Sequence, residues 1–228
     1  MPDLTRVTTL TFDCYGTLID WEAGLIAVLR PLLARYGVTQ SDDEIVAAFQ
    51  DIEAPLCEPP YRSYRTVLAS VVEGFAQRFG FSVGHAEREA LAASVASWRP
   101  FPDTVGALRA LAAGYRLAVI SNIDDDLFKT TAPQLGVSFD CVVTAQGARC
   151  YKPDHTIFEL ALGRLGVKAH QVAHVAEGVT EIPPARRLGC TTVWVRRRGR
   201  SARLLTEASD LEVPALSSLL PHVGIDGG

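Results

Sequence analysis

Six side chains able to do chemistry cluster directly after predicted strands of this 228-residue chain. They are Asp13, Ser121, Asn122, Lys152, Glu177 and Glu181. In an open parallel sheet, ligands bind beyond the carboxyl ends of the strands, so these groups should meet at one edge. A carboxylate beside an ammonium can stay ionised and attack a substrate, forming an ester that water then opens. The order of the strands therefore predicts one site where carboxylates, an ammonium, a hydroxyl and an amide that could carry such chemistry converge.

The segments that position these groups alternate between strand and helix patterns. β-rich apolar runs cover 7–12, 115–120, 141–144, 172–176 and 191–195. Helical spacing covers 103–113, 124–135, 154–165 and 182–188. This alternation predicts an α/β fold with a doubly wound, Rossmann-like parallel sheet. The tail after Arg200 carries no clear pattern.

Residues 20–98 contain helix patterns and no predicted strand. An S-x-x-E capping box begins at Ser41, and an apolar stripe at helical spacing runs over 64–79. Pro31 lies inside another stripe, where we expect a kink or a break. We therefore expect a core of residues 1–19 and 99–228 with an inserted all-helical cap of residues 20–98.

The composition argues against several classes of partner and site. The net charge of −4 favours neither nucleic acid nor anionic membranes, and no stretch is apolar enough to span a bilayer. The start of the chain lacks the basic region of a signal peptide, so we expect a cytoplasmic protein. Five cysteines without a C-x-x-C pair predict no disulfide framework and no zinc site. The basic run Arg196, Arg197, Arg198 and Arg200 predicts a solvated edge.

The motifs resemble those of a known superfamily. F-D-x-Y-G-T-L at 12–18, I-S-N at 120–122, Y-K-P-D at 151–154 and an acidic fourth segment look like the four motifs of haloacid dehalogenase superfamily hydrolases. The D-x-Y-G-T form is typical of the L-2-haloacid (type II) dehalogenases, whereas phosphatases of the superfamily usually carry a second Asp at position 15. The resemblance covers nearly the whole chain, with 20–98 at the place of the helical cap.

The resemblance implies roles for these residues, and with them an (S)-2-haloacid dehalogenase-like enzyme. It makes Asp13 the nucleophile, Lys152 its counter-ion, Thr17 an oxyanion partner and Glu181 the group that orients or deprotonates water. It assigns Ser121 and Asn122 to a small anionic substrate and its departing halide, with Tyr15 on the pocket wall. Such an enzyme needs no cofactor, and members of this kind form homodimers.

Tyr15 favours dehalogenation over phosphate transfer. A phosphate ester usually needs an acid to protonate its leaving oxygen, and tyrosine has a reference pKa near ~10. A phosphate dianion also repels Asp13, at roughly 4 kcal/mol per charge pair for about 4 Å and an effective dielectric near 20. Magnesium normally offsets that repulsion. The alternative is thus a Mg-dependent phosphatase with the metal held by Asp13, the Tyr15 backbone and Glu177.

The fourth segment departs from the dehalogenase pattern, because Ala176 and Gly178 stand at polar positions and Glu181 replaces an Asp. No arginine stands near 48–49, where the cap of these enzymes offers one to the substrate carboxylate. Arg62 and Arg65 are the nearby substitutes. These departures keep open a third interpretation, a catalytically weak protein that binds a small carboxylate or a protein partner.

Structural interpretations compete with each of these roles. Asp13 can cap a turn, Ser121 and Asn122 can begin a helix, and the other charged groups can be solvated. Cys14 is counted among the substrate-binding residues, although alternation along the chain turns its side chain away from the face of Asp13. We expect His174 to be a buried core histidine.

Overall fold

The computed structural model describes Leu4, residues 6–197 and residues 209–225, and it has an α/β fold built on a parallel sheet. The sheet has the strand order β3-β2-β1-β4-β5-β6. Its strands are β1 (Thr9–Phe12), β2 (Arg116–Ser121), β3 (Cys141–Thr144), β4 (Val172–Ala176), β5 (Thr191–Val195) and β6 (Leu211–Val213). Each neighbouring pair is parallel, so the predicted fold class is confirmed.

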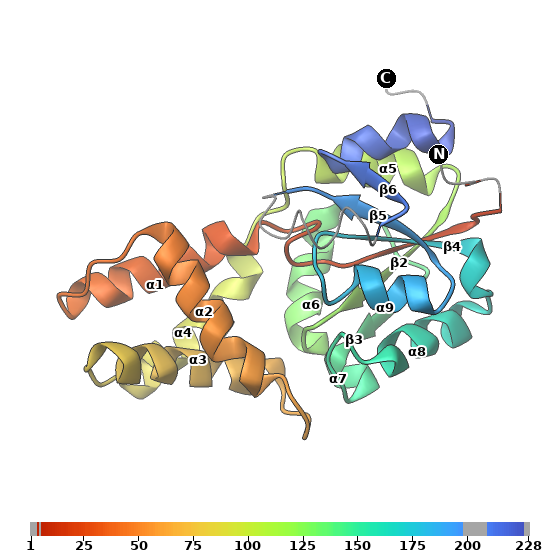
Figure 1. Ribbon diagram of the computed structural model, residues 1–228. Helices are drawn as coiled ribbons and strands as arrows, with labels where there is room; N and C mark the ends of the chain where they lie inside the picture. Colours follow the sequence, from red (N-terminus) through yellow and green to blue (C-terminus); the bar gives the residue numbers. More distant parts are fainter. Residues whose placement is uncertain (1–3, 5, 198–208, 226–228) are drawn as a thin grey trace.

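Helices cover both faces of the sheet (Figure 1). One face packs against α5 (Thr104–Ala112), α6 (Asp125–Thr131) and the 3-10 helix η4 (Leu216–Val223). The other packs against α8 (His155–Leu165) and α9 (Ile182–Arg187). The short helix α7 (Ala145–Ala148) follows β3. Two 3-10 turns, η2 (Ala132–Leu135) and η3 (Ala169–Gln171), also belong to the core, and a third, η1 (Val95–Ser97), ends the helical region.

The central place of β1 fixes where the site forms. Phe12, its last residue, pairs with Val119 of β2 and Val175 of β4, so these three strands end together. The chain reaches β4 from β3 at the sheet edge, which makes the β1–β4 boundary the topological switch point where such folds bind ligands.

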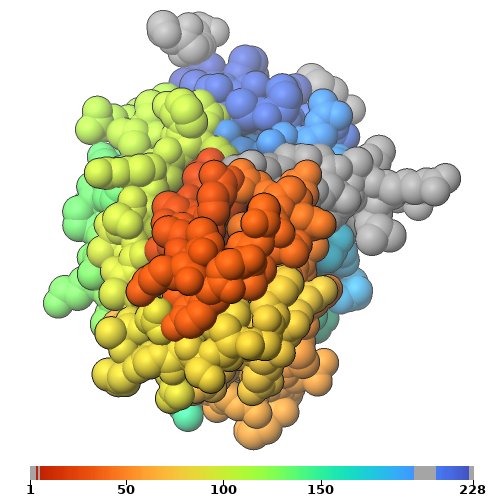
Figure 2. All heavy atoms as spheres, turned by 90° about the vertical axis from the view of Figure 1, so that its left-hand side faces the viewer, coloured from red at the N-terminus to blue at the C-terminus, as the bar shows by residue number. Residues whose placement is uncertain are grey.

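The helical region lies between β1 and β2 in sequence and beside the sheet in space. Its helices are α1 (Trp21–Arg35), α2 (Asp42–Leu56), α3 (Tyr64–Phe79) and α4 (His85–Ser94). Ser41 and Glu44 form the predicted capping box. α1 continues through Pro31, so of the expected kink or break the break does not occur. These helices occupy the middle of one face of the molecule (Figure 2). The exact domain limits 1–19, 20–98 and 99–228 stay a prediction.

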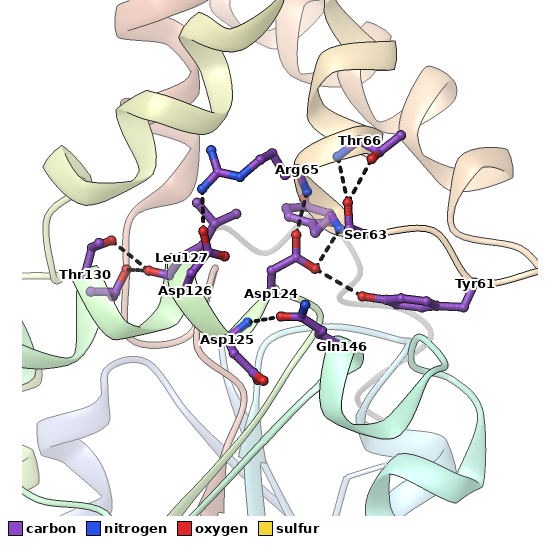
Figure 3. A network of polar contacts seen from close by, with 12 residues as sticks. Tyr61, Ser63, Arg65, Thr66, Asp124, Asp125, Asp126, Leu127, Thr130 and Gln146 are labelled. Carbon is purple, nitrogen blue, oxygen red and sulfur yellow. Dashed lines mark hydrogen bonds and ion pairs between the residues drawn. The ribbon is translucent and has the colours of Figure 1, made fainter.

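Asp124 joins the helical region to the core (Figure 3). Its buried carboxylate accepts hydrogen bonds from the Tyr61 hydroxyl at 3.1 Å and from the backbone amides of Tyr64 at 2.9 Å and Arg65 at 2.8 Å. The two amides belong to the first turn of α3 and have no partner within the helix. A core carboxylate thus satisfies them and fixes where α3 begins.

The C-terminal part of the sheet differs from expectation. β6 adds a sixth strand that the sequence pattern did not indicate. Arg197 is buried rather than solvated: it donates to Asp103 at 2.6 Å and to the Thr17 carbonyl at 3.0 Å, over the Phe101 ring. A buried carboxylate partner explains why this arginine leaves the solvent. Arg196 keeps an exposed pair with Glu212, and Arg198 and Arg200 lie outside the described residues.

No helix within the described ranges is long and apolar enough to cross a membrane. His174, on β4, is fully buried as expected, with its Nδ1 2.9 Å from the Thr11 hydroxyl and its ring against Phe158. Burial, with a smaller effect of the Lys152 charge, lowers the pKa of His174 from 6.5 to about 3. The imidazole is therefore neutral in the folded protein, which rules it out as a charged partner of the site.

Because His174 is neutral when folded, we expect the free energy of unfolding to depend on pH. Between pH 6.5 and about 3 the unfolded chain binds a proton at His174 that the folded chain does not, so stability falls as the pH falls through that window. His174→Asn keeps a polar atom for Thr11 and removes the titration. Urea unfolding across the window should show a slope shallower by up to about 1.4 kcal/mol per pH unit. Parallel profiles for the two proteins would show that His174 is not the group responsible.

Candidate active site

An ion pair between Asp13 and Lys152 forms the floor of the site. Lys152 Nζ lies 2.6 Å from Asp13 Oδ1, and the Thr17 hydroxyl donates to Asp13 Oδ2 at 2.9 Å. Asp13 follows β1, Thr17 lies in the turn after it, and Lys152 lies in the loop between α7 and α8. Both carboxylate oxygens thus have a hydrogen-bond donor, and the lysine supplies the opposite charge.

Lys152 is held by its backbone as well as by its charge. The Asn122 side chain accepts from the Lys152 amide at 2.8 Å, and its Nδ2 lies 3.4 Å from the Lys152 carbonyl. Nζ also donates to the Ile120 carbonyl at 2.9 Å. Burial by itself lowers the pKa of this ammonium, but the charges of Asp13 and Glu181 outweigh it and raise the pKa. Lys152 is therefore a fixed cation.

Glu181 approaches Lys152 from the other side. Its Oε1 lies 3.3 Å from Lys152 Nζ and accepts from the Thr180 hydroxyl at 2.6 Å. Burial raises the pKa of Glu181 above its usual value, and the nearby charge of Asp13 adds to that effect while Lys152 opposes it. A carboxylate with a raised pKa is a better proton acceptor near neutral pH, as an activator of water must be.

Gly178 makes room for this glutamate. A methyl group at Gly178 would lie 2.2 Å from Glu181 Oε2, closer than real side-chain contacts allow. The extra methylene of Glu181, relative to aspartate, thus occupies space that a side chain at position 178 would fill. Of the three departures in the fourth segment, those at Gly178 and Glu181 therefore compensate each other.

The turn after β4 is tied to the turn after β1. The backbone amide of Glu177 donates to the Thr17 hydroxyl at 3.0 Å, while the same hydroxyl donates to Asp13. The Glu177 side chain lines the cavity and stays half-buried. Thr17 thus links the two turns at the switch point.

Two further side chains present polar groups beside Asp13. The Ser121 hydroxyl is buried and has no hydrogen-bond partner within the described ranges, although its residue lines the cavity. Such a group is expected to bond a ligand or water. The Tyr15 hydroxyl, in contrast, is bonded to the Thr131 hydroxyl at 2.7 Å, and burial raises the pKa of Tyr15 well above its usual value.

A cavity of about 730 Å³ opens above this floor, between the core and the helical region. Asp13, Tyr15, Ser121, Asn122, Lys152, Glu177 and Glu181 all line it. Aromatic rings form much of the remaining wall: Trp21, Phe49, Tyr61, Tyr64, Trp98, Tyr151 and Trp194. The predicted residues thus converge, under a wall supplied largely by the helices.

Three predicted substrate-binding side chains lie elsewhere. Cys14 is fully buried in the hydrophobic core, where burial raises the pKa of its thiol, and it does not line the cavity. Arg65 pairs with Asp126 at 2.6 Å at the junction with the core (Figure 3). Arg62 is bonded to the Leu56 carbonyl on the exposed loop after α2. Neither arginine lines the cavity, so these three assignments are corrected.

Sequence reasoning missed Arg149, which lines the cavity from the core side. Its guanidinium lies over the Tyr61 ring, 4.5 Å from the centroid. It also missed Glu53, whose carboxylate accepts from Tyr64 and Cys57 on the wall made by the helices. Position 149 is three residues before Lys152, in the loop that the Y-K-P-D motif places at the site. The nearness of Arg149 to that motif is therefore the sequence signal that could have found it.

The residues predicted to hold magnesium were Asp13, the Tyr15 backbone and Glu177. Asp13 already contacts a cation and a hydroxyl, and the described ranges contain no group of three or more His, Cys, Asp or Glu side chains placed to hold a metal ion. Two carboxylates and a carbonyl are oxygen donors of the kind that Mg²⁺ takes together with water and substrate phosphate. This assignment stays a prediction, and no step below depends on a metal.

Gly178→Ala tests the space occupied by Glu181. The added methyl should displace the carboxylate by about 1 Å, which lowers turnover by about 10- to 100-fold. The free energy of unfolding should change by less than about 1 kcal/mol, because a flexible side-chain end absorbs the clash. Gly163→Ala, at an open exposed site, is the matched control.

The double variant Gly178→Ala/Glu181→Asp provides the decisive comparison. It should be no slower than Gly178→Ala alone, because the shorter side chain removes the clash. Multiplicative losses in the double variant would mean that the two positions act independently.

The comparisons with known proteins agree with this geometry. Residues 7–189 match the model of the haloacid dehalogenase-like hydrolase family. The chain is 26% identical over 225 residues to an (S)-2-haloacid dehalogenase of Burkholderia cepacia, covering 92% of each protein. It is also 26% identical over 223 residues to a pyrophosphatase of Bacillus velezensis, covering 96% of this chain and 98% of that one.

A crystal structure of an L-2-haloacid dehalogenase superposes with a TM-score of 0.81 at 25% identity, covering 96% of this chain and 99% of that one. The resemblance seen in the four motifs is thereby confirmed. Since the family match extends over most of the sequence, this chain belongs to the haloacid dehalogenase-like hydrolases.

Proposed function

We propose that this hydrolase removes halide from a 2-haloacid and yields a 2-hydroxyacid. The observation that carries the proposal is the pairing at the cavity floor: an Asp13 carboxylate held by Lys152 and Thr17, with a neutral Tyr15 in place of an acid. This arrangement provides a nucleophile, and position 15, where an acid would protonate a leaving oxygen, offers no proton donor of suitable pKa.

In the first step, an Asp13 oxygen attacks the carbon that bears the halogen. The new carbon–oxygen bond forms as the carbon–halogen bond breaks, and the halide leaves with the bonding electrons. The attacked carbon carries no charge, and halide leaves without a proton. The free Ser121 hydroxyl and the Asn122 amide lie on the cavity wall as hydrogen-bond donors for the substrate or the halide.

In the second step, water opens the Asp13 ester. Glu181 accepts a proton as the water oxygen bonds to the ester carbonyl carbon, and Lys152 with Thr17 stabilises the developing oxyanion. Cleavage of the acyl carbon–oxygen bond frees the 2-hydroxyacid and regenerates Asp13. One proton of the water ends on the product hydroxyl and the other is released.

The second candidate is hydrolysis of a small phosphate ester. Glu177 and Glu181 place two further carboxylates beside the cavity, and a pyrophosphatase relative shares the same 26% identity as a dehalogenase relative. Tyr15 argues against this candidate, because its buried hydroxyl is bonded to Thr131 and its pKa is raised. The third, non-catalytic interpretation is weakened because Gly178 accommodates Glu181, while Ala176 and the missing cap arginine still support it. A cytoplasmic location and a homodimer also remain predictions.

A two-substrate panel separates these candidates. Purified enzyme should release chloride from L-2-chloropropionate with no added metal, and Asp13→Asn should lower that rate by at least about 1,000-fold because it removes the nucleophile. Ion chromatography measures the chloride, and circular dichroism checks that the variant is folded.

The same enzyme should leave p-nitrophenyl phosphate unchanged with and without magnesium. Phosphate release that requires magnesium, without chloride release, would replace the proposal by the second candidate. Inactivity of a folded enzyme on 2-haloacids of any size would support the non-catalytic interpretation.

A further inference from the structure

The cations that line the cavity in the described part of the chain are Lys152 and Arg149. The Lys152 side chain is 0% exposed and already pairs with Asp13 and Glu181. Arg149 is exposed, and its recorded contact is with the Tyr61 ring. Its guanidinium donors thus face the cavity side without a carboxylate partner in the described ranges.

The backbone of Arg149 is in an unfavourable conformation. At φ 60° it lies in the left-handed region, directly after α7, where glycine is the usual residue. A side chain with a Cβ atom is disfavoured there by steric contact with the following carbonyl oxygen. Such an outlier, next to the loop that carries Lys152, indicates that the arginine serves a function other than folding.

The ring under Arg149 is itself fixed. Tyr61 stacks on Tyr151 with ring centroids 5.4 Å apart, and its hydroxyl is bonded to the buried Asp124 carboxylate. The Tyr61 ring therefore does not need to be ordered when a ligand binds next to Arg149. Arginine presents a planar pair of donors that matches a carboxylate.

The wall supplied by the helices repels anions elsewhere. Glu22, Glu53 and Glu58 line it, so a substrate carboxylate placed there would meet like charges. Arg149 is on the opposite, core side. Asp154, Glu177 and Glu181 line the core side as well, so Arg149 is the cation among the lining residues described here that is left to attract a substrate carboxylate.

The size of the cavity indicates what the rest of the substrate is. A volume of about 730 Å³ is in the range that holds drug-sized ligands, far more than a three-carbon acid occupies. Trp21, Phe49 and Trp98 line it with apolar surface. A bulky apolar group on the halogen-bearing carbon would cover these rings and exclude water from the ester.

We propose, resting on the dehalogenase function above, that Arg149 binds the carboxylate of the substrate and that this substrate is a 2-haloacid with a bulky apolar, aryl-type substituent. Arg149 then replaces the cap arginine that this chain lacks. The aromatic wall selects the substituent. Asp13 attacks the halogen-bearing carbon, which lies between the carboxylate and that substituent.

The test measures binding and turnover separately. The probes for binding are 3-phenyllactate, lactate and the neutral 3-phenyllactamide, followed by isothermal titration calorimetry. The probes for turnover are 2-bromo-3-phenylpropionate and 2-bromopropionate, followed by halide release. The variants are Arg149→Met, Arg149→Gly, which suits the left-handed backbone and secures a folded variant, and Arg62→Met as the matched loss of a nearby positive charge outside the cavity.

We expect 3-phenyllactate to bind more tightly than lactate, and both Arg149 variants to weaken its binding by about tenfold or more. Binding of the neutral amide should change little in any variant, and Arg62→Met should match the wild type. Equal effects of Arg149→Met and Arg62→Met, or equal affinity for lactate and 3-phenyllactate, would overturn the inference.

Turnover measurements distinguish a failure of this inference from a failure of the proposed function. The value of kcat/KM should be higher for 2-bromo-3-phenylpropionate than for 2-bromopropionate, which carries the same halogen on a smaller acid. Halide release with no dependence on Arg149 would overturn only the assignment of Arg149. Binding of 3-phenyllactate that depends on Arg149, without halide release from any acid, would overturn dehalogenation and leave the carboxylate site in place.

Discussion

The site depends on one buried cation shared by two carboxylates. Lys152 lies between Asp13 and Glu181 with no exposed side-chain surface, and each of the three charges would be unfavourable there without the others. Removing the ammonium would leave two carboxylates close together in a poorly hydrated place, where at least one would take up a proton. The cation therefore holds the two carboxylates together at the cavity floor, and burial raises the pKa of Glu181. The proposed roles of a nucleophile and a proton acceptor rest on this arrangement.

The fold supplies these charges from separate strands. Asp13 follows the central strand β1, and Glu181 follows β4. Lys152 follows β3 and is fixed by Asn122, which comes directly after β2. Because β1, β2 and β4 end in register, small adjustments in the turns complete the contact. Gly178 is one such adjustment. The helical region closes the opposite side, and Asp124 anchors it to the core.

Local patterns predicted the sheet core and the residues at strand ends. Alternation of strand and helix placed Asp13, Lys152 and Glu181 at one edge of the sheet, and the resemblance of the four motifs singled them out as one site. Side-chain directions in the loops and helices were not predictable in this way: Arg62 and Arg65 lie near the site in sequence, yet their partners are the Leu56 carbonyl and Asp126. Arg149 and the burial of Arg197 depend on contacts between distant segments, with Tyr61 and Asp103 respectively, which no local pattern encodes.

The most direct test of the account is the fate of the oxygen atoms of Asp13. If Asp13 forms an ester that water opens at its carbonyl carbon, many turnovers in H₂¹⁸O will introduce ¹⁸O into the Asp13 side chain. In a single turnover with excess enzyme the product hydroxyl will carry ¹⁶O from the protein. Mass spectrometry of the peptide that contains Asp13 and of the 2-hydroxyacid reads out both. An unlabelled Asp13 after many turnovers, with ¹⁸O in the product of a single turnover, would mean that water attacks the substrate directly and would contradict the account.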